Sequence, residues 1–328
     1  MKEELTLEKI QKSFLNGDMS NEDITDLLIS LIDGSEDAKV RAETIVTLEK
    51  LVFKDEKFFK ILENHLVSDE NANVRASAAK IIILNHLEEG LEPLEWTTRH
   101  DKSPLVIKMI WDTFDSKKLI KYEIIVENLS NFLDTFASNL GVVHEEARFF
   151  LDLEAIFSKG KRNYEVNPLD YNNFEVLYDY KDSEPWLVIN NRHVEVLNLN
   201  FFNWRYIKEH GEIFNSFSKL KYMDIYLNMI RKYNNYNFDY TEVPESIGRL
   251  TSLKKLVLAR NNLQNIPESI KNLTLLSELD LSHNQLQEIP RVLKSLNSLE
   301  QLNIKYNIIS RIPQSMKNFV NSLVDFKL

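Results

Sequence analysis

The chain has 328 residues, no cysteine and a formal net charge of −10. Its length suffices for two domains or two repeat arrays, and the lack of cysteine excludes disulfide bonds, thiolate zinc ligands and cysteine nucleophiles. No apolar run approaches the roughly 18 residues of a membrane helix, and residues 1–16 lack the apolar core of a signal sequence, so we expect a cytoplasmic protein without membrane insertion.

The acidic charge is concentrated in the first part of the chain. Residues 1–140 contain 17 Lys+Arg and 27 Asp+Glu, a difference of −10, whereas residues 141–328 contain 23 of each and sum to zero. Proteins that bind nucleic acids usually present a basic patch or stripe. We therefore expect no nucleic-acid partner.

Residues 1–140 are predicted to form an array of helix pairs. Segment 37–42 (DAKVRA) recurs as 71–76 (NANVRA), and a third copy begins at a similar interval with Ser103. Apolar residues follow each copy at helical spacing, and an amphipathic segment precedes each copy, although the one around Trp96 is poor. Helix pairs that recur at such an interval are typical of an α-solenoid.

The spacing of Asp37, Val40 and Arg41 resembles that of HEAT repeats over residues 20–115, with tetratricopeptide and armadillo-like pairs as the near alternatives. The resemblance implies that the aspartate caps the second helix and that the arginine bonds across to the neighbouring repeat. Arg75 occupies the equivalent position in the second copy. In the third copy Ile107 replaces the arginine, so the ladder is predicted to end there.

A domain boundary is predicted near Gly141, giving a helical domain, 1–140, and a second domain, 141–328, whose first part, about 141–193, is a cap. The helix around Glu146–Leu153 has two interpretations: it caps the second domain, or it closes the helical array. The segments 186–189 and 194–199 flank turn residues and predict a β-hairpin that enters the second domain.

The second domain contains a 23-residue repeat. Pro244, Pro267, Pro290 and Pro313 stand at this interval, each after an aliphatic residue. An L-x-x-L-x-L-x-x-N-x-φ frame, with φ apolar, occurs three times: Leu253, Leu256, Leu258, Asn261, Leu263; Leu276, Leu279, Leu281, Asn284, Leu286; and Leu299, Leu302, Ile304, Asn307, Ile309. The L-x-L element predicts a short strand, the asparagine a turn that bonds adjacent coils, and the proline the start of a helical segment.

Less regular copies flank these three repeats. Val194, Leu197 and Leu199 fill part of the frame, and a second copy begins at Leu220, with an insertion at 229–240. Leu323, Phe326 and Leu328 repeat the frame at the other end. Because no polar capping helix follows this last strand, we expect weak self-association. The alternatives are that the chain is a piece of a longer protein or that the short strand is itself a sufficient cap.

The cadence N-x-L-x-x-I-P-x-S-I-x-x-L over 194–328 resembles the leucine-rich repeats of the Ras-group or Scribble type, which occur in many bacterial and archaeal proteins. The resemblance implies an α/β solenoid with a parallel, concave sheet and protein–protein binding on that face. In some relatives the partner is a small GTPase.

Signatures of catalysis are missing from the sequence. The seven glycines are all far apart, which excludes P-loop, dinucleotide-binding and nucleophile-elbow motifs. The histidines are isolated, and the His-Glu pair at 144–145 is followed by Arg148 where a zinc-protease motif needs histidine. We predict no catalytic, cofactor-binding or metal-binding residues, and no enzyme.

Residues between the frame positions are predicted to point out of the concave sheet and to bind a partner. This set comprises Tyr222, Asp224, Tyr226, Lys255, Arg260, Glu278, Asp280, His283, Gln301, Lys305 and Tyr306. A second candidate is the insertion, with Arg231, Lys232, Tyr233, Tyr236 and Phe238. Interface hot spots favour tyrosine and arginine. The sequence thus predicts a non-catalytic protein-binding adaptor or scaffold; the alternative is a HEAT-like lyase or glycosylase module with a leucine-rich targeting domain.

Overall fold

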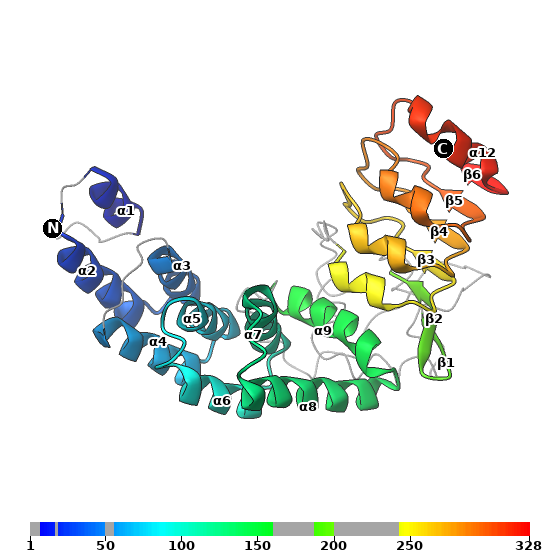
Figure 1. Cartoon of the computed structure of the whole chain (residues 1–328). Coiled ribbons are helices and arrows are strands. Elements are labelled where there is room, and N and C mark those ends of the chain that lie inside the picture. Colours follow the sequence, from blue (N-terminus) through cyan, green and yellow to red (C-terminus); the bar gives the residue numbers. More distant parts are fainter. Residues whose placement is uncertain (1–6, 17–18, 50–55, 160–186, 200–242) are drawn as a thin grey trace, which may run out of the picture. The chain divides into compact units, whose positions relative to one another are not determined.

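The computed structural model describes residues 7–16, 19–49, 56–159, 187–199 and 243–328 (Figure 1). The chain divides into two compact units, residues 1–132 and 133–328. The division falls within helix α8 (Glu123–Leu140). The two units are called the helical unit and the repeat unit below, and each is described by itself.

The helical unit is built from consecutive helices. Its helices before α8 are α1 (Leu7–Asn16), α2 (Asn21–Gly34), α3 (Ala38–Glu49), α4 (Glu56–Ser68), α5 (Ala72–Asn85), α6 (Leu91–His100) and α7 (Pro104–Lys117). The second helix of each predicted pair packs on its counterparts, since α5 contacts both α3 and α7. The first helices are likewise in contact, α2 with α4 and α4 with α6, so the pairs stack in chain order.

Residues that favour a helix start, and apolar side chains that become buried, account for the position and packing of these helices. Asn71 caps α5 by accepting a hydrogen bond from the amide of Asn73 at 2.9 Å, and Pro104 occupies the first turn of α7. Ile82 and Ile110 are fully buried at helix–helix contacts. In the poorly amphipathic segment around Trp96, which forms α6, the Trp96 indole is 44% exposed and stacks on His100 of the same helix with ring centroids 4.7 Å apart.

The repeat unit contains one six-stranded sheet within its described residues. The strands are β1 (Leu187–Asn190), β2 (His193–Asn198), β3 (Lys255–Val257), β4 (Glu278–Asp280), β5 (Gln301–Asn303) and β6 (Asp325–Lys327), in the order β1-β2-β3-β4-β5-β6. The predicted hairpin is present: β1 and β2 are antiparallel, and their two-residue turn has φ of 50° at Asn191 and 67° at Arg192. From β2 onward every pair is parallel.

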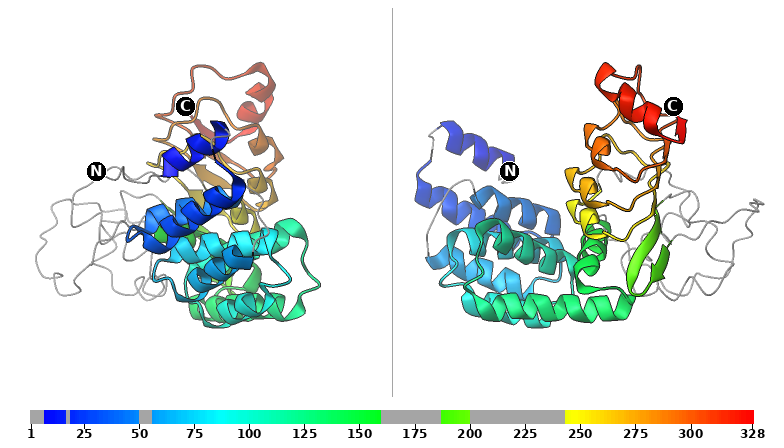
Figure 2. Two further views of the ribbon diagram at one scale, coloured as in Figure 1. Left: turned by 90° about the vertical axis from the view of Figure 1, so that its left-hand side faces the viewer. Right: turned by 45° about the vertical axis from the view of Figure 1, so that its right-hand side comes forward.

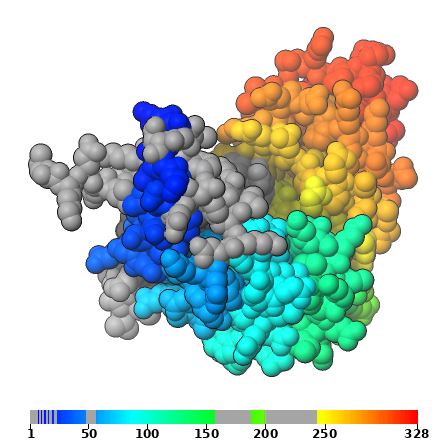
Figure 3. All heavy atoms as spheres, turned by 60° about the vertical axis from the view of Figure 1, so that its left-hand side comes forward, coloured from blue at the N-terminus to red at the C-terminus, as the bar shows by residue number. Residues whose placement is uncertain are grey.

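Each regular coil returns through a short 3₁₀ helix on the side opposite the strands (Figures 1 and 2). These helices are η3 (Glu245–Arg249), η4 (Glu268–Asn272), η5 (Arg291–Ser295) and η6 (Gln314–Met316), the last continued by α12 (Lys317–Ser322). The four repeat prolines are their N-cap residues. In space-filling view the coils succeed one another from yellow to red in chain order (Figure 3).

The frame leucines form the core between the sheet and the 3₁₀ helices. Leu253, Leu256, Leu258 and Leu263 are fully buried, as are their equivalents Leu276 and Leu281. Because side chains alternate along a strand, burial of Leu256 directs its neighbours Lys255 and Val257 to the other face. The alternation of inward and outward side chains along each strand therefore determines which residues lie on the face of the sheet opposite the core. We call this face the open face.

Adjacent coils also meet closely at η3 and η4. A Cβ atom added at Gly248 would lie 2.5 Å from the carbonyl oxygen of Ser269. The carboxylate of Glu245 accepts hydrogen bonds from the amides of Glu268 at 3.2 Å and Ser269 at 2.9 Å. Burial alone would raise the pKa of Glu245, but these hydrogen bonds lower it. One coil therefore caps the 3₁₀ helix of the next.

β2 pairs directly with β3, with Leu197 opposite Leu256. The sequence pattern predicted a further irregular repeat, beginning at Leu220, between these two copies of the frame. The sheet has no strand between β2 and β3, and Leu220 itself lies outside the described residues. Counting frame copies along the chain does not reveal which strands become neighbours in the sheet.

Helix α9 (His144–Lys159) covers the first coil of the repeat unit, where it contacts η3. Its Glu146 is 1% exposed and accepts hydrogen bonds from the amide of Val194 at 2.8 Å and from Nδ1 of His193 at 3.0 Å. Its Asp152 accepts a hydrogen bond from Ser246 at 2.6 Å. Helix α9 thus packs on the first coil of the repeat unit.

Candidate functional site

The turn that follows each strand is held by a ladder of asparagines. Nδ2 of Asn284 donates to the carbonyls of Leu258 and Leu281, both at 2.9 Å, and its Oδ1 accepts from the amide of Leu263 at 3.1 Å. Asn307 repeats these bonds one coil further on, with Leu281 and Ile304 as carbonyl partners. Each asparagine therefore bonds its own coil and the preceding one, which keeps the equivalent residues of successive coils in line.

The residue before each ladder asparagine has a left-handed backbone. The φ angles are 59° for Arg260, 55° for His283 and 59° for Tyr306. The amide of Arg260 donates to the carbonyl of Ser282 at 2.9 Å, and the amide of His283 donates to that of Lys305 at 2.8 Å. Three side chains of different chemistry are thus presented at the same position of three consecutive coils. We call this row the turn row.

Two members of the turn row are in aromatic contact. The rings of His283 and Tyr306 stack with centroids 4.2 Å apart and an interplanar angle of 23°. Tyr306 is nevertheless 70% exposed, and Arg260 is exposed as well. Burial and the nearby charge of Arg260 lower the pKa of His283, although Asp280 opposes this shift. At neutral pH the His283 ring is therefore uncharged and stacks as a neutral aromatic.

The face of the sheet carries charges that pair with one another. Nζ of Lys255 lies 3.0 Å from a carboxylate oxygen of Glu278, its cross-strand neighbour. The carboxylate of Asp280 accepts from Nδ2 of Asn303 on the next strand at 3.1 Å and from the amide of Ser282 at 2.8 Å. These interactions tie neighbouring coils together, and they leave a polar face with little net charge in its centre.

The predicted site residues fall into two groups. The structure brings together those between Lys255 and Tyr306 on strands β3 to β5 and the turns after them. Outside the described residues lie Tyr222, Asp224 and Tyr226, together with the insertion residues Arg231, Lys232, Tyr233, Tyr236 and Phe238. A role of either group in binding stays a prediction.

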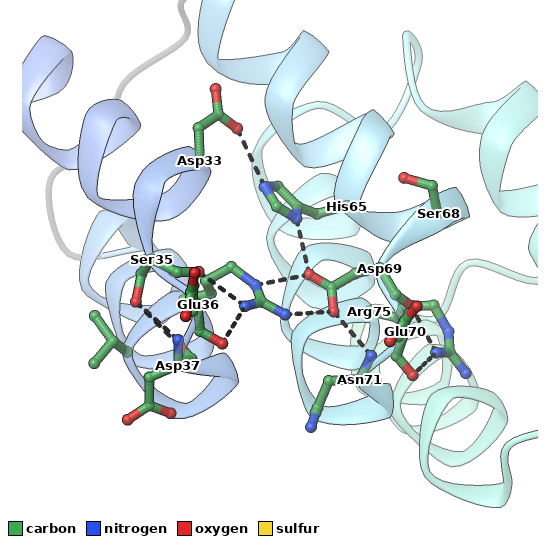
Figure 4. A network of polar contacts seen from close by, with 12 residues as sticks. Asp33, Ser35, Glu36, Asp37, His65, Ser68, Asp69, Glu70, Asn71 and Arg75 are labelled. Carbon is green, nitrogen blue, oxygen red and sulfur yellow. Dashed lines mark hydrogen bonds and ion pairs between the residues drawn. The ribbon is translucent and has the colours of Figure 1, made fainter.

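The helical unit contains a second polar arrangement, which repeats from pair to pair (Figure 4). The guanidinium of Arg41 donates to both carboxylate oxygens of Asp69, at 2.9 and 3.0 Å, and to the carbonyl of Ser35 at 2.9 Å. Arg75 makes the same contacts with Asp101, at 2.7 and 3.1 Å, and with the carbonyl of Asp69 at 2.8 Å. Each arginine thus fixes its own turn and the next one.

Asp69 has further polar partners besides Arg41. It accepts from the amide of Asn71 at 2.8 Å and contacts Nδ1 of His65 at 3.0 Å, while Nε2 of His65 lies 3.4 Å from Asp33. Burial would raise the pKa of Asp69, but its hydrogen bonds with Arg41, Asn71 and His65 together lower it. The HEAT resemblance implied that the arginine bonds across to the neighbouring repeat, whereas the acceptors Asp69 and Asp101 were not identified from the sequence.

The described residues provide neither a candidate metal site nor a candidate membrane-spanning helix. In that part of the chain no group of three or more His, Asp or Glu side chains is placed to hold a metal ion. The same residues include no helix that is long and apolar enough to cross a membrane.

Comparisons with known proteins identify the repeats. A sequence model of the family described as "Leucine rich repeat" matches residues 244–286. Among solved structures, a leucine-rich repeat protein of Leptospira interrogans is 29% identical over 26% of this chain and 22% of its own length, with a TM-score of 0.25. The chain thus spans about a fifth of that protein. No curated protein matches the chain. Residues 244–286 are therefore a leucine-rich repeat region.

Proposed function

We propose that this protein is a non-catalytic adaptor that binds a partner protein on the open face of its parallel sheet. The observation that carries the proposal is the register of that face: Lys255, Glu278, Gln301 and Asp325 lie opposite one another on four successive strands. Such alignment creates one continuous polar surface on a rigid support. Its outer part adds exposed tyrosine and arginine, the residues that most often dominate binding energy at protein interfaces.

The helical unit supplies a second surface in this proposal. Its stacked pairs and its arginine–aspartate ladder support a HEAT-like solenoid, so that the chain acts as a scaffold with two binding regions. The repeat cadence supports leucine-rich repeats of the Ras-group or Scribble type. The lack of cysteine favours a cytoplasmic location.

The test uses paired variants of the 328-residue chain. The face variant combines Gln301→Arg with Lys305→Glu, at two exposed residues of the sheet side. The control variant makes the same two changes on the side of the 3₁₀ helices, as Gln314→Arg and Lys294→Glu, also at exposed residues. Circular dichroism first establishes that both variants keep the wild-type fold and stability.

Partners captured from a native lysate are identified by mass spectrometry, purified and titrated against the three proteins by calorimetry. We expect the face variant to weaken binding at least about tenfold, the effect of losing about 1.4 kcal/mol, and the control variant to bind as wild type. The proposal fails if every purified partner binds the face variant and the control variant with equal affinity.

A further inference from the structure

The side of the repeat unit formed by the 3₁₀ helices carries a row of lysines. Lys271, Lys294 and Lys317 stand 23 residues apart, at the same position of three successive coils, on η4, η5 and α12. All three are exposed, and so is Arg291, which lies one turn before Lys294. We call these four residues the cationic side. Because equivalent positions stack from coil to coil, the row runs along the helices that Figures 1 and 2 show in succession.

The positive charge of this side is not balanced locally. The residues of η5, η6 and α12 include the cations Arg291, Lys294 and Lys317 and no acidic residue. None of these three cations takes part in an ion pair within the described part of the chain, whereas Lys271 acts electrostatically on Glu245. Like charges at neighbouring positions repel one another. The cationic side therefore favours an anionic partner.

The other side chains of this surface indicate the class of that partner. Among the residues of the 3₁₀ helices and α12, no large apolar side chain is exposed, and the one aromatic residue, Phe319, is half-buried. Proteins that lie on membranes insert apolar side chains, and proteins that hold single-stranded nucleic acid stack its bases on aromatic side chains. The cationic side offers neither, so a folded protein with an acidic surface fits it best.

The chain itself contains such a surface in its helical unit. Residues 1–140 contain 27 Asp+Glu and 17 Lys+Arg. On α8, Glu123 and Glu127 are exposed and stand one turn apart, a spacing of about 5–6 Å between Cβ atoms. Strands of successive coils lie about 4.8 Å apart, so carboxylates one turn apart on a helix match cations on successive coils.

We propose that the cationic side binds the acidic helical unit of a second copy of this chain, head to tail. Each copy then contributes a different surface to the contact, so the association continues in one direction instead of closing as a symmetric dimer. Single exposed ion pairs contribute little free energy, and salt screens them. The association is therefore weak and depends on ionic strength. It does not rest on the adaptor proposal, which concerns the open face.

The test follows the 328-residue chain by sedimentation velocity over a concentration series at low and at high salt. The cationic-side variant combines Lys294→Glu with Lys317→Glu. The matched control combines Lys12→Glu with Lys102→Glu, at two exposed lysines of the helical unit, and changes the net charge by the same amount. Circular dichroism first establishes that both variants keep the wild-type fold.

We expect the average mass of the wild type to rise with concentration at low salt and to fall to that of the monomer at high salt. The cationic-side variant should need at least about tenfold higher concentration for the same mass. The control should associate as wild type or more strongly, because its helical unit becomes more acidic. The neutral pair Lys294→Gln and Lys317→Gln should give an intermediate result, and it replaces the glutamate variant if that variant misfolds.

A mixing experiment tests the head-to-tail geometry. The cationic-side variant keeps its acidic helical unit, so a fluorescein-labelled sample should sediment as a monomer alone and faster in an excess of unlabelled wild type. A symmetric contact between two cationic sides, or one made elsewhere in the chain, does not predict this difference.

Several results would overturn the inference. They are a monomer mass at every concentration in low salt, equal association of the cationic-side variant and the control, association that high salt leaves unchanged, or no binding of the labelled variant to wild type. Saturable binding of DNA or of phosphatidylserine vesicles that is lost with Lys294 and Lys317, in a chain that stays monomeric, would assign the surface to phosphate groups instead. The adaptor test stays separate, because its control variant replaces the cation lost at Lys294 by one at residue 314 of the same side.

Discussion

Replacement of Asn284 by alanine probes the asparagine ladder at its most enclosed point. The side chain is 6% exposed, and the substitution removes its bonds to Leu258, Leu281 and Leu263. The two carbonyls keep a partner, because Asn261 also donates to Leu258 at 2.8 Å and Asn307 to Leu281 at 2.9 Å. The amide of Leu263, which has one hydrogen to donate, loses its bond.

The expected loss of stability follows from this single amide without an acceptor. A buried donor left without an acceptor costs about 1–3 kcal/mol, and Leu263 is fully buried. We therefore expect Asn284→Ala to lower the free energy of unfolding of the repeat unit by about 1–3 kcal/mol. Asn307→Ala should cost a similar amount, because it removes the acceptor at 3.0 Å from the amide of Leu286, a residue that is 1% exposed.

Native-state hydrogen exchange is the suitable assay, since a chain with two compact units need not unfold in a single transition. Amides of β3 to β5 report the stability of the repeat unit alone. The matched control is Asn297→Ala, an exposed asparagine between coils, which should change stability by no more than about 0.5 kcal/mol. Equal losses for Asn284→Ala and Asn297→Ala would refute the ladder as a source of stability.

Three further predictions concern other parts of the chain. Gly248→Ala should destabilise the repeat unit by about 1–3 kcal/mol in urea unfolding, because the new Cβ would lie 2.5 Å from the Ser269 carbonyl; a wild-type midpoint would contradict the close contact. Asp69 has a lowered folded pKa, so it stabilises the helical unit above its unfolded pKa of about 3.9, and the contribution disappears as the pH falls through the folded value. Acid titration of Asp69→Asn, followed by circular dichroism, should lack this pH-dependent loss; an unchanged acid profile would count against the Arg41–Asp69 bond as a source of stability. A fragment of residues 141–328 should fold alone, because α9 covers the first coil; a fragment with molten-globule spectra would show that the boundary is misplaced.

Much of the repeat unit could be predicted because its signals are local. The regular repeat places Leu256 in the core and Lys255 on the open face, and the prolines mark the start of each 3₁₀ helix. The hairpin at β1 and β2 was likewise predicted from a short run of residues. Such features depend on alternation and turn chemistry within one coil, and each coil repeats them.

The candidate site could be predicted only in outline. The outward positions, Arg260 and His283 among them, follow from the frame, but the stacking of His283 on Tyr306 does not. It requires two turns in left-handed conformation on adjacent coils at a particular spacing. Likewise, the poorly amphipathic segment around Trp96 did not reveal that the indole is 44% exposed and stacks on His100.

What the sequence by itself determined is the repeating unit: which residues turn inward, where each coil bends, and that helix pairs precede the coils. Only the tertiary structure decided which distant groups meet. Arg41 bonds Asp69 on another helix, Glu146 of α9 bonds Val194 of β2, and β2 lies beside β3 although the long segment between Asn198 and Lys255 separates them in the chain. The physical reason is that periodicity reports burial within a segment, whereas partner choice depends on how separate segments approach one another, and many charged residues in this sequence could have served as partners.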